Sequence, residues 1–567
     1  MAETLCLAAG KAGCVVTVSC LNDRSAAVGT SPQGTWSGSG VFLTLDPGII
    51  LCHGSVFSPF LLETEHFSST KCKVLLPENF SPDLQIQVLV TDEGSSQPPC
   101  RSLPDRDLGD GTPMLRFNQL SSQQKIHNSR KHREAELILM APCLQFQEAF
   151  AKIFSASDQW HFGVNEVGQE SGSVADEMRF LHWFALLRIL DSRFPSSGWV
   201  SCAPAKWLRK GDPLIACGSP FGAFCPDIFM NTFSKGIVSN TSGEGNVLIL
   251  TDARCLPGTE GGGVFAVSKN GFHLVGIIVI PLCWKANEWV GLTLVCAIDC
   301  ILESIGHILS GPPWFCKTWL HPMALVTKPH YGPVARDGLI QQMLAAVVLV
   351  ECGPTWGSGV MVSPRLVLTC RHVVSGASNV CVRLQPHLDK ASVAKGKVIF
   401  ATKDSSPYDV ALVELEESLT TFAIPILASE FCPGEEVSVV GFGVFGQTCS
   451  PSVTSGILSA VITVEEKTVM LQATCAVHGG SSGGALFSMR SGKLLGIVAS
   501  NTRDNSIGVT YPHLNFSIPI TVLQPAIWEF IQERRLHAFQ ELDRVGKRIQ
   551  VVWRLQREPE TMPLSKL

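Results

Sequence analysis

The sequence predicts an all-β protein built from two copies of one barrel-forming unit, followed by a C-terminal amphipathic helix. Short apolar runs follow one another at regular spacing, with glycine, proline or serine between them. This pattern is typical of β-barrels and not of alternating strands and helices. A tryptophan-centred pattern occurs at Trp36 and again at Trp356. After the last strand-like run, Ile527, Phe530 and Ile531 fall near helical spacing.

The duplication is visible in two matched stretches. The first copy contains WSGSGVFL at 36–43 and GIILCH at 48–53, and the second contains WGSGVMV at 356–362 and LVLTCRH at 366–372. Self-similarity at a long period indicates a repeated domain. The first copy also carries a large polar insertion, mostly between 61 and 180, which we expect to form accessible loops.

We therefore expect four segments in the chain. They are a degenerate first domain with long inserted loops at 1–300, a linker at 301–340, a second domain at 341–525, and a C-terminal helix and tail at 526–567.

Composition excludes several classes of function. The 567-residue chain has a formal net charge of −5, which argues against a nucleic-acid partner. No apolar stretch approaches 18 residues, so no membrane span is predicted, and the N-terminus lacks a basic, signal-like start. The 21 cysteines contain no C-x-x-C pair. We expect reduced, buried thiols, with no metal site and no cofactor.

Three residues of the second copy form a candidate catalytic set. His372 follows an apolar strand, Asp409 precedes the run VALV, and Ser482 lies in the turn GGSSGGALF at 479–487. A nucleophile, a general base and an orienting carboxylate are what acyl transfer needs. Glycines in such a turn let backbone N–H groups converge on the reacting oxygen, so Gly480 and Ser482 are the candidate oxyanion hole.

Each of these residues alone has a plainer interpretation. His372 could be a surface histidine, Asp409 a loop carboxylate, and the glycine run an ordinary turn. Ser481 is a rival nucleophile because it adjoins Ser482. Order, spacing and flanking residues together favour the triad, with Ser482 directly before the glycine pair.

The first copy lacks the same set. When the cysteines are aligned, His53 falls one position before the general base, Trp183 stands at the aspartate, and Gly261 stands at the serine. A glycine cannot be a nucleophile, so we expect the first copy to be inactive and to pack on, gate or restrain the second.

With these motifs, residues 340–525 resemble the HtrA/Deg-type trypsin-fold serine proteases, and 10–300 resemble them more weakly. The resemblance implies tandem trypsin-like double β-barrels and serine endopeptidase activity. In that fold Ala476 would lie at the base of the primary substrate pocket, with Ala499, Ser500 and Asn501 along its wall. Ser481 replaces the usual Asn or Asp, and the C-terminal helix stands where relatives usually carry a PDZ module, of which the sequence shows no pattern.

The chain ends in Ser565, Lys566 and Leu567, a peroxisomal address read by an import receptor. We therefore expect localisation in the peroxisomal matrix. Together with the duplication, this ending is similar to peroxisomal members of the Deg group. The similarity implies removal of N-terminal leaders from imported matrix enzymes, including those of fatty-acid β-oxidation, with cleavage after cysteine or another small residue. Cys100 lies in a polar, proline-rich loop and is a candidate self-cleavage site for a pocket that accepts cysteine. The HtrA resemblance implies a homo-oligomer.

The sequence is compatible with two other interpretations. One is a catalytically silent tandem pseudoprotease that acts as a scaffold or chaperone-like binder, which the degenerate first copy favours. The other is a cytosolic protease whose terminal tripeptide arose by chance.

Overall fold

The computed structural model describes most of both copies. The described residues are 10–20, 34–45, 48–62, 74–91, 130–154, 160–162, 179–191, 200–268, 271–281, 283–285, 288–309, 334–384, 393–419, 422–504 and 509–554. Cys100 and the three C-terminal residues Ser565, Lys566 and Leu567 lie outside them.

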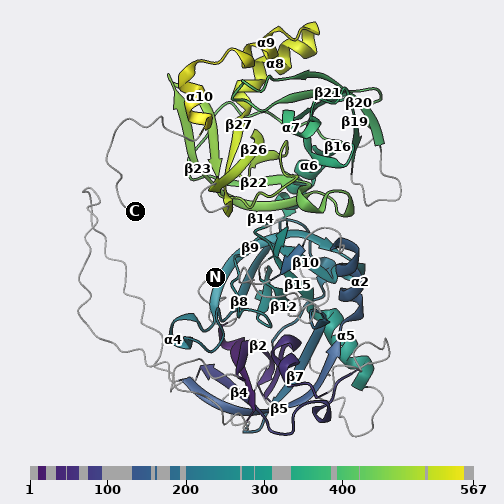
Figure 1. Ribbon diagram of the computed structural model, residues 1–567, viewed down its shortest axis with the longest axis vertical. Coiled ribbons are helices and arrows are strands. Elements are labelled where there is room, and N and C mark those ends of the chain that lie inside the picture. The colour runs from purple at the N-terminus through teal and green to yellow at the C-terminus, as the bar shows by residue number, and fades with distance from the viewer. Residues whose placement is uncertain are drawn as a thin grey trace, which may run out of the picture.

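The chain forms four closed six-stranded antiparallel barrels, two in each copy. Figure 1 shows the two copies as two bodies, the first in purple to teal and the second in green to yellow. The tandem double-barrel fold predicted from the sequence is confirmed. Closure of each sheet removes the exposed edges that an open sheet would leave unpaired.

The two barrels of the first copy use strands that are rich in β-branched residues and buried along most of their length. The first is formed by β1 (Gly13–Cys20), β2 (Trp36–Leu45), β3 (Gly48–His53), β4 (Leu84–Thr91), β5 (Arg130–Pro142) and β7 (Trp183–Ile189). The second is formed by β8 (Pro213–Gly218), β9 (Thr232–Ser242), β10 (Leu248–Thr251), β11 (Gly263–Ser268), β12 (Gly271–Ile280) and β15 (Thr293–Ala297).

The second copy repeats the same strand order. Its first barrel contains β16 (Val347–Cys352), β17 (Thr355–Ser363), β18 (Leu366–Thr369), β19 (Asn379–Arg383), β20 (Val393–Ala401) and β21 (Ala411–Leu415). Its second contains β22 (Glu436–Gly441), β23 (Ser452–Val464), β24 (Lys467–Ala473), β25 (Ala485–Ser488), β26 (Leu494–Asp504) and β27 (Val509–Pro519).

A small extra sheet of the first copy lies where the two copies meet. It consists of β6 (Trp160–Phe162), β13 (Cys283–Lys285) and β14 (Glu288–Trp289) in the order β14-β13-β6. Strand β14 packs against β27 of the second copy, and Figure 1 shows it at the junction.

Helices are short and peripheral. The described helices are α2 (Leu144–Ile153), α4 (Pro226–Phe229), α5 (Ile298–Leu309), α6 (Val334–Ala345), α7 (Arg371–Val374), α8 (Ile520–Glu533), α9 (His537–Gln540) and α10 (Lys547–Arg554), with the 3₁₀ segments η1 (Gly54–Phe60), η3 (Pro77–Asn79), η5 (Ala205–Trp207), η6 (Glu244–Asn246), η8 (Gly443–Thr448) and η9 (Glu541–Asp543). None of the helices in the described ranges is both long and apolar enough to cross a membrane.

The C-terminal helix begins earlier than expected. Helix α8 starts at Ile520, directly after β27 ends at Pro519, and not at 526. Ile520 and Leu523 are buried at helical spacing, so the apolar face of the helix extends back to the last strand. The expected linker also begins and ends in helix, because α5 continues to Leu309 and α6 starts at Val334.

The two copies interlock through buried contacts. The carboxylate of Asp252 in the first copy accepts hydrogen bonds from Ile237 N (2.7 Å) and from Ser455 N and Oγ of the second copy (2.6 and 2.8 Å). Phe445 and Cys449 of the second copy are buried within the hydrophobic core of the first. The junction therefore shares core residues and is not a flexible hinge.

Candidate functional site

His372 and Asp409 meet at one end of the first barrel of the second copy. His372 lies in α7, immediately after β18, and Asp409 lies two residues before β21, the strand that pairs with β18. Asp409 Oδ2 is hydrogen-bonded to His372 Nδ1, and Asp409 Oδ1 accepts from the backbone N–H of His372 at 3.1 Å. The pairing of β18 with β21 thus brings two residues 37 positions apart into contact.

The electrostatics of the pair keep the aspartate ionised. Burial acts to raise the pKa of Asp409, but the hydrogen bond and charge of His372 and the charge of Arg371 bring it below its usual value. A carboxylate held in this way fixes the orientation of the imidazole and favours the imidazolium that forms when the ring takes a proton. The His372 side chain is half exposed, so its other ring nitrogen is accessible to a substrate.

The serine turn is attached to the same barrel through Ser358 of β17. Its backbone N–H donates to Ser482 O at 2.9 Å, and its hydroxyl donates to Gly480 O at 2.9 Å. Phe442 N donates to the same hydroxyl at 2.9 Å. One buried serine therefore connects the two barrels at the point where the candidate nucleophile lies.

The histidine helix and the serine turn approach each other over Gly357. A methyl group on Gly357 would lie 2.5 Å from Cγ2 of Val373, the neighbour of His372, and 3.2 Å from Ser482 O. Only glycine leaves room for both. Cys370 Sγ and Gly483 N also donate to the same acceptor, the carbonyl of Val498. The structure thus brings the segments that carry all three sequence-predicted residues to one site.

The turn also presents backbone donors. Gly480 has a φ of +86°, which glycine adopts without strain. Within the described part of the chain, the N–H groups of Gly480 and Ser482 donate to no protein acceptor, whereas those of Ser481 and Gly483 donate to carbonyls. Two unengaged N–H groups, one of Ser482 itself and one two residues before it, suit an oxyanion hole for attack by Ser482.

Ser481 has a different environment from Ser482. Ser481 is buried, its N–H donates to His478 O at 2.9 Å, and its hydroxyl accepts a 3.4 Å hydrogen bond from His478 N. These bonds close the turn internally. Ser482 is partly exposed, so it is the serine of the two that a substrate can reach.

Cys370, His372 and Asp409 place potential metal ligands within 4.8 Å of one another. The chemistry of this set does not suit a metal ion. Burial and the charge of Asp409 raise the pKa of the Cys370 thiol well above its usual value, and metal ligation needs the thiolate. His372 Nδ1 is already engaged by Asp409.

Comparisons of the sequence show which proteins the chain is similar to. A model of the trypsin-like peptidase domain matches residues 357–497. A mouse protein named peroxisomal leader peptide-processing protease is 48% identical over 592 residues, covering 99% of this chain and 98% of the relative. The human protein of the same name is 45% identical over 586 residues, with 99% and 98% covered.

This chain belongs to the peroxisomal leader peptide-processing protease family. It is therefore a peroxisomal serine protease of trypsin-like fold that acts on protein substrates. A probable periplasmic DegP-like serine endoprotease of Buchnera aphidicola is 30% identical over 178 residues, covering 30% of this chain and 34% of the relative. The similarity to Deg-type proteases noted in the sequence thus extends to bacterial proteins.

In this leader peptide-processing protease, the first copy departs from the active pattern differently than the sequence predicted. His53 is the N-terminal cap of η1, as Cys370 is of α7, and the strand registers agree with that alignment. Ser55, two residues after its cap, therefore occupies the position of His372. The prediction that His53 lies one position before the general base is wrong, because aligning the cysteines shifts β3 by one residue. His53 instead is buried and bonds Leu181 O at 3.2 Å.

The serine position of the first copy is also corrected. Ser39 N donates to Glu260 O at 2.9 Å, as Ser358 N donates to Ser482 O at 2.9 Å. Glu260, and not Gly261, is therefore the counterpart of Ser482. The strand registers make Trp183 the counterpart of Asp409, as predicted. Ser55, Trp183 and Glu260 cannot form a serine triad.

The side chain of Glu260 forms a hydrogen bond within its own turn. Its Oε2 accepts a hydrogen bond from Gly258 N at 2.6 Å. Gly258 is the counterpart of Gly480: its φ is +91°, and Ser39 Oγ donates to its carbonyl at 2.8 Å. In the first copy, the N–H equivalent to that of Gly480 therefore donates to a carboxylate oxygen.

The predicted pocket residues lie on two adjoining segments of the second barrel. Ala476 is buried and its carbonyl accepts from Thr454 Oγ1 at 2.8 Å. Ala499, Ser500 and Asn501 lie on β26, and Asn501 Nδ2 donates to Val477 O at 3.5 Å. The two segments are thus in contact, with Ala499 buried and Ser500 exposed.

The sequence interpretation missed polar residues on the neighbouring strand β27. Asn515 pairs with Asn501, and Ser517 pairs with Val498. Asn515 Oδ1 and Ser517 Oγ are buried and have no partner in the described part of the protein. Both oxygens therefore keep an acceptor site beside β26. No local sequence signal distinguishes them, because only strand pairing places them beside β26.

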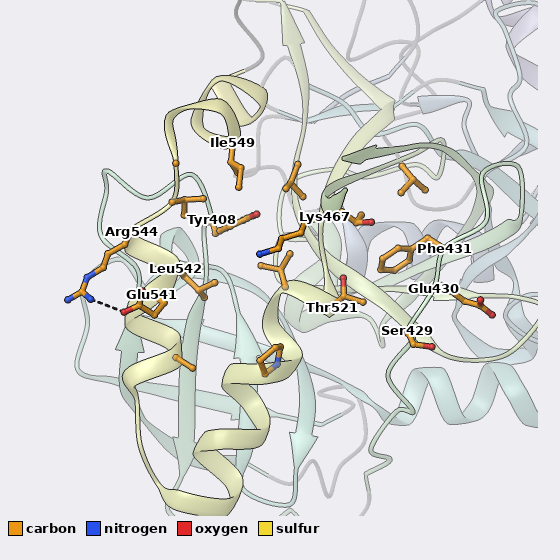
Figure 2. Close-up of a pocket in the computed structure, with 18 of the residues that line it drawn as sticks. Tyr408, Ser429, Glu430, Phe431, Lys467, Thr521, Glu541, Leu542, Arg544 and Ile549 are labelled. Atoms are coloured by element: carbon orange, nitrogen blue, oxygen red, sulfur yellow. Dashed lines mark hydrogen bonds and ion pairs between the residues drawn. The ribbon is translucent and has the colours of Figure 1, made fainter. Parts of the chain in front are cut away.

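A separate cavity of about 800 Å³ lies between the C-terminal helices and the second copy's barrels. Figure 2 shows Tyr408 and Lys467 on its lining, beside the helical segment that carries Glu541 and Arg544. It contains none of the predicted pocket residues. Its lining includes Tyr408, the residue that precedes Asp409 in the sequence.

Proposed function

We propose that Ser482 is the nucleophile, His372 the general base and Asp409 the orienting carboxylate of a serine endopeptidase. The observation that carries this assignment is the His372–Asp409 hydrogen bond beside a serine turn held by Ser358. His372 removes the proton of Ser482 as the hydroxyl attacks the scissile carbonyl, then donates it to the leaving amine. Water then attacks the acyl-enzyme, and His372 again acts first as base and then as acid, which releases the product and restores Ser482.

Gly480 N and Ser482 N stabilise the oxyanion in this proposal. The first copy supports the assignment, because the equivalent N–H of Gly258 binds a carboxylate oxygen of Glu260 at 2.6 Å. A turn that holds an anionic oxygen in one copy is suited to a developing oxyanion in the other. One such donor contributes about 3–4 kcal/mol to lowering the barrier.

The proposed substrates are proteins that carry N-terminal leaders, as the relatives' name indicates. We propose that they include imported matrix enzymes of fatty-acid β-oxidation, cut after cysteine or another small residue. Ala476 and Ala499 carry no anion that could receive a basic side chain. The polar side chains on and beside β26 (Ser500, Asn501, Asn515 and Ser517) are neutral. A small, weakly polar pocket favours a short side chain over lysine or arginine.

Three further parts of the proposal concern the whole chain. Cys100 is the proposed site of self-cleavage, Ser565, Lys566 and Leu567 bind the peroxisomal import receptor, and copies of the chain assemble into a homo-oligomer. Deleting Leu567 should leave the protein outside peroxisomes when it is imaged in cells.

The test of the proposed function compares wild-type protein with Ser482→Ala on a leader-bearing peroxisomal precursor. Mass spectrometry of the products gives the cleavage sites. We expect cleavage by wild type alone, after cysteine or a small residue, and a wild-type fragment ending at Cys100 that disappears in Cys100→Lys. Equal cleavage by wild type and Ser482→Ala would contradict the nucleophile. Absence of cleavage by folded wild type would favour a scaffold or chaperone-like binder.

A further inference from the structure

The loop behind the proposed oxyanion turn is buried in the first copy. Phe445 of η8 is 3% exposed and belongs to the first copy's hydrophobic core. Its ring stacks on Trp160 at a centroid distance of 5.8 Å and meets Phe154 edge-on at 5.8 Å. On its other side it meets His478 edge-on at 6.1 Å. Phe445 therefore connects the first copy's core to the start of the serine turn.

Lys285 of β13 anchors the same loop with its charge. Its Nζ donates to Val444 O at 3.4 Å. The ammonium also lies over two rings, at 5.1 Å from the centroid of Trp160 and 5.3 Å from that of Trp356. Trp160 belongs to the first copy and Trp356 to the second. A cation held between two aromatic faces and a carbonyl joins the copies at one point.

The same loop contacts the part of the serine turn that carries the Gly480 N–H. Val444 N donates to His478 Nδ1 at 3.1 Å, and Trp356 Nε1 donates to Gly443 O at 3.0 Å. Gly480 packs so closely on the Gly443 carbonyl that a side chain at 480 would collide with it. A shift of residues 443–444 would therefore move the N–H of Gly480 directly.

Residues 289–291 of the first copy also lie against the second copy's second barrel. Trp289 of β14 meets His513 edge-on at 5.5 Å. A methyl group on Gly291 would lie 3.3 Å from the Cβ of Ala476. The end of the extra sheet and the residues that follow it thus lie beside His513 and Ala476 of the second copy.

We propose that Lys285 of the first copy is a positioning residue for the oxyanion turn of the second. By holding the 443–448 loop against His478 and Gly480, it sets the place of the Gly480 N–H. The degenerate copy then acts as a built-in activator of the neighbouring site. This inference rests on the proposed role of the turn in catalysis.

The test measures the rate at which a peptidyl phosphonate labels the active serine, together with kcat and KM on a leader peptide. Lys285→Met keeps the aliphatic stem and removes the charge. We expect it to lower the labelling rate constant and kcat by about tenfold each, with KM changed less, because a misplaced oxyanion donor weakens transition-state binding. Lys285→Arg, which keeps the cation and its donors, should retain most of the rate.

The matched control is Lys206→Met, which removes a cation 5.4 Å from the Trp207 ring elsewhere in the first copy and should leave the labelling rate unchanged. Because the rate constant is measured on protein that becomes labelled, partial unfolding lowers the final amplitude and not the rate. If wild type is labelled and Lys285→Met is labelled at the same rate, the positioning role is overturned. Wild type that does not label at all would instead contradict the proposed function.

Discussion

At the residue scale, Glu260 shows how one side chain silences a serine-protease turn while preserving its shape. The turn of the first copy keeps the positive φ of Gly258 and the hydrogen bonds from Ser39. Glu260 replaces the nucleophile and places its own carboxylate on the N–H of Gly258. A charged oxygen in this place blocks access to the donor and supplies no nucleophilic hydroxyl.

Restoring a serine at this position should therefore not restore activity. In a Ser482→Ala background, we expect Glu260→Ser to remain unlabelled by a serine-directed phosphonate, because Ser55 and Trp183 occupy the base and aspartate positions. Mass spectrometry of the intact protein gives the result. Labelling at position 260 in that double variant would show that the first copy retains a working base.

The residues of the candidate site differ in how far the sequence could place them. The sequence predicts His372, Asp409 and Ser482 as the triad, because each lies beside an apolar strand with a distinctive flank. Trp183 was placed correctly in the first copy, but the counterparts of the base and the serine were misplaced, because Cys52 and Cys370 can be aligned even though the strand registers differ by one residue. Hydrogen bonds of Ser39 and Ser358 decide the register, and a sequence does not display them.

At the element scale, helix α8 fastens the C-terminal segment to the second copy. Phe530 is 4% exposed, and the guanidinium of Arg534 lies 4.4 Å from its ring centroid. The next residue, Ile531, is 45% exposed. The C-terminal helix was predicted from this periodicity, but its start was missed because no cap residue or glycine separates β27 from Ile520.

The two neighbours on α8 provide a matched pair of substitutions. We expect Phe530→Ala to lower the free energy of unfolding by about 3 kcal/mol or more, since it leaves a cavity in the core. Ile531→Ala should cost less than about 1 kcal/mol, because nearly half of the residue is exposed to solvent. Urea unfolding followed by tryptophan fluorescence would measure both. Equal losses from the two variants would contradict the described face of α8.

At the scale of the whole molecule, buried histidines link stability to pH. Burial lowers the pKa of His53 to about 4 and that of His478 to about 4, against an ordinary value of 6.5. Between pH 6.5 and 4 the unfolded chain binds more protons than the folded one. The stability due to each neutral histidine is therefore complete above pH 6.5 and is lost as pH falls toward 4.

This linkage predicts a measurable difference for His53→Asn. Between pH 7 and pH 5, each buried histidine should remove about 2 kcal/mol of unfolding free energy. We expect the variant to lose less stability than wild type over that interval in urea titrations. His307→Gln, whose side chain is 79% exposed, is the control and should follow wild type. A His53→Asn protein with the full wild-type loss would contradict the buried, neutral histidine.

The relation between the two copies could not be predicted from the sequence in detail. Duplication predicted tandem barrels, but the insertion of Phe445 into the first copy's core and the contacts of Lys285 depend on how the barrels face each other. Neither residue lies in a motif, because an interface needs only complementary shape and charge.

The central claim is that Ser482, and not Ser481, is the nucleophile of a working triad. The most direct measurement treats wild type, Ser482→Ala and Ser481→Ala with a peptidyl phosphonate and maps the adduct by mass spectrometry. We expect the label on Ser482 in wild type, no label in Ser482→Ala, and a label on Ser482 in Ser481→Ala. A label that persists in Ser482→Ala and disappears in Ser481→Ala would contradict the account.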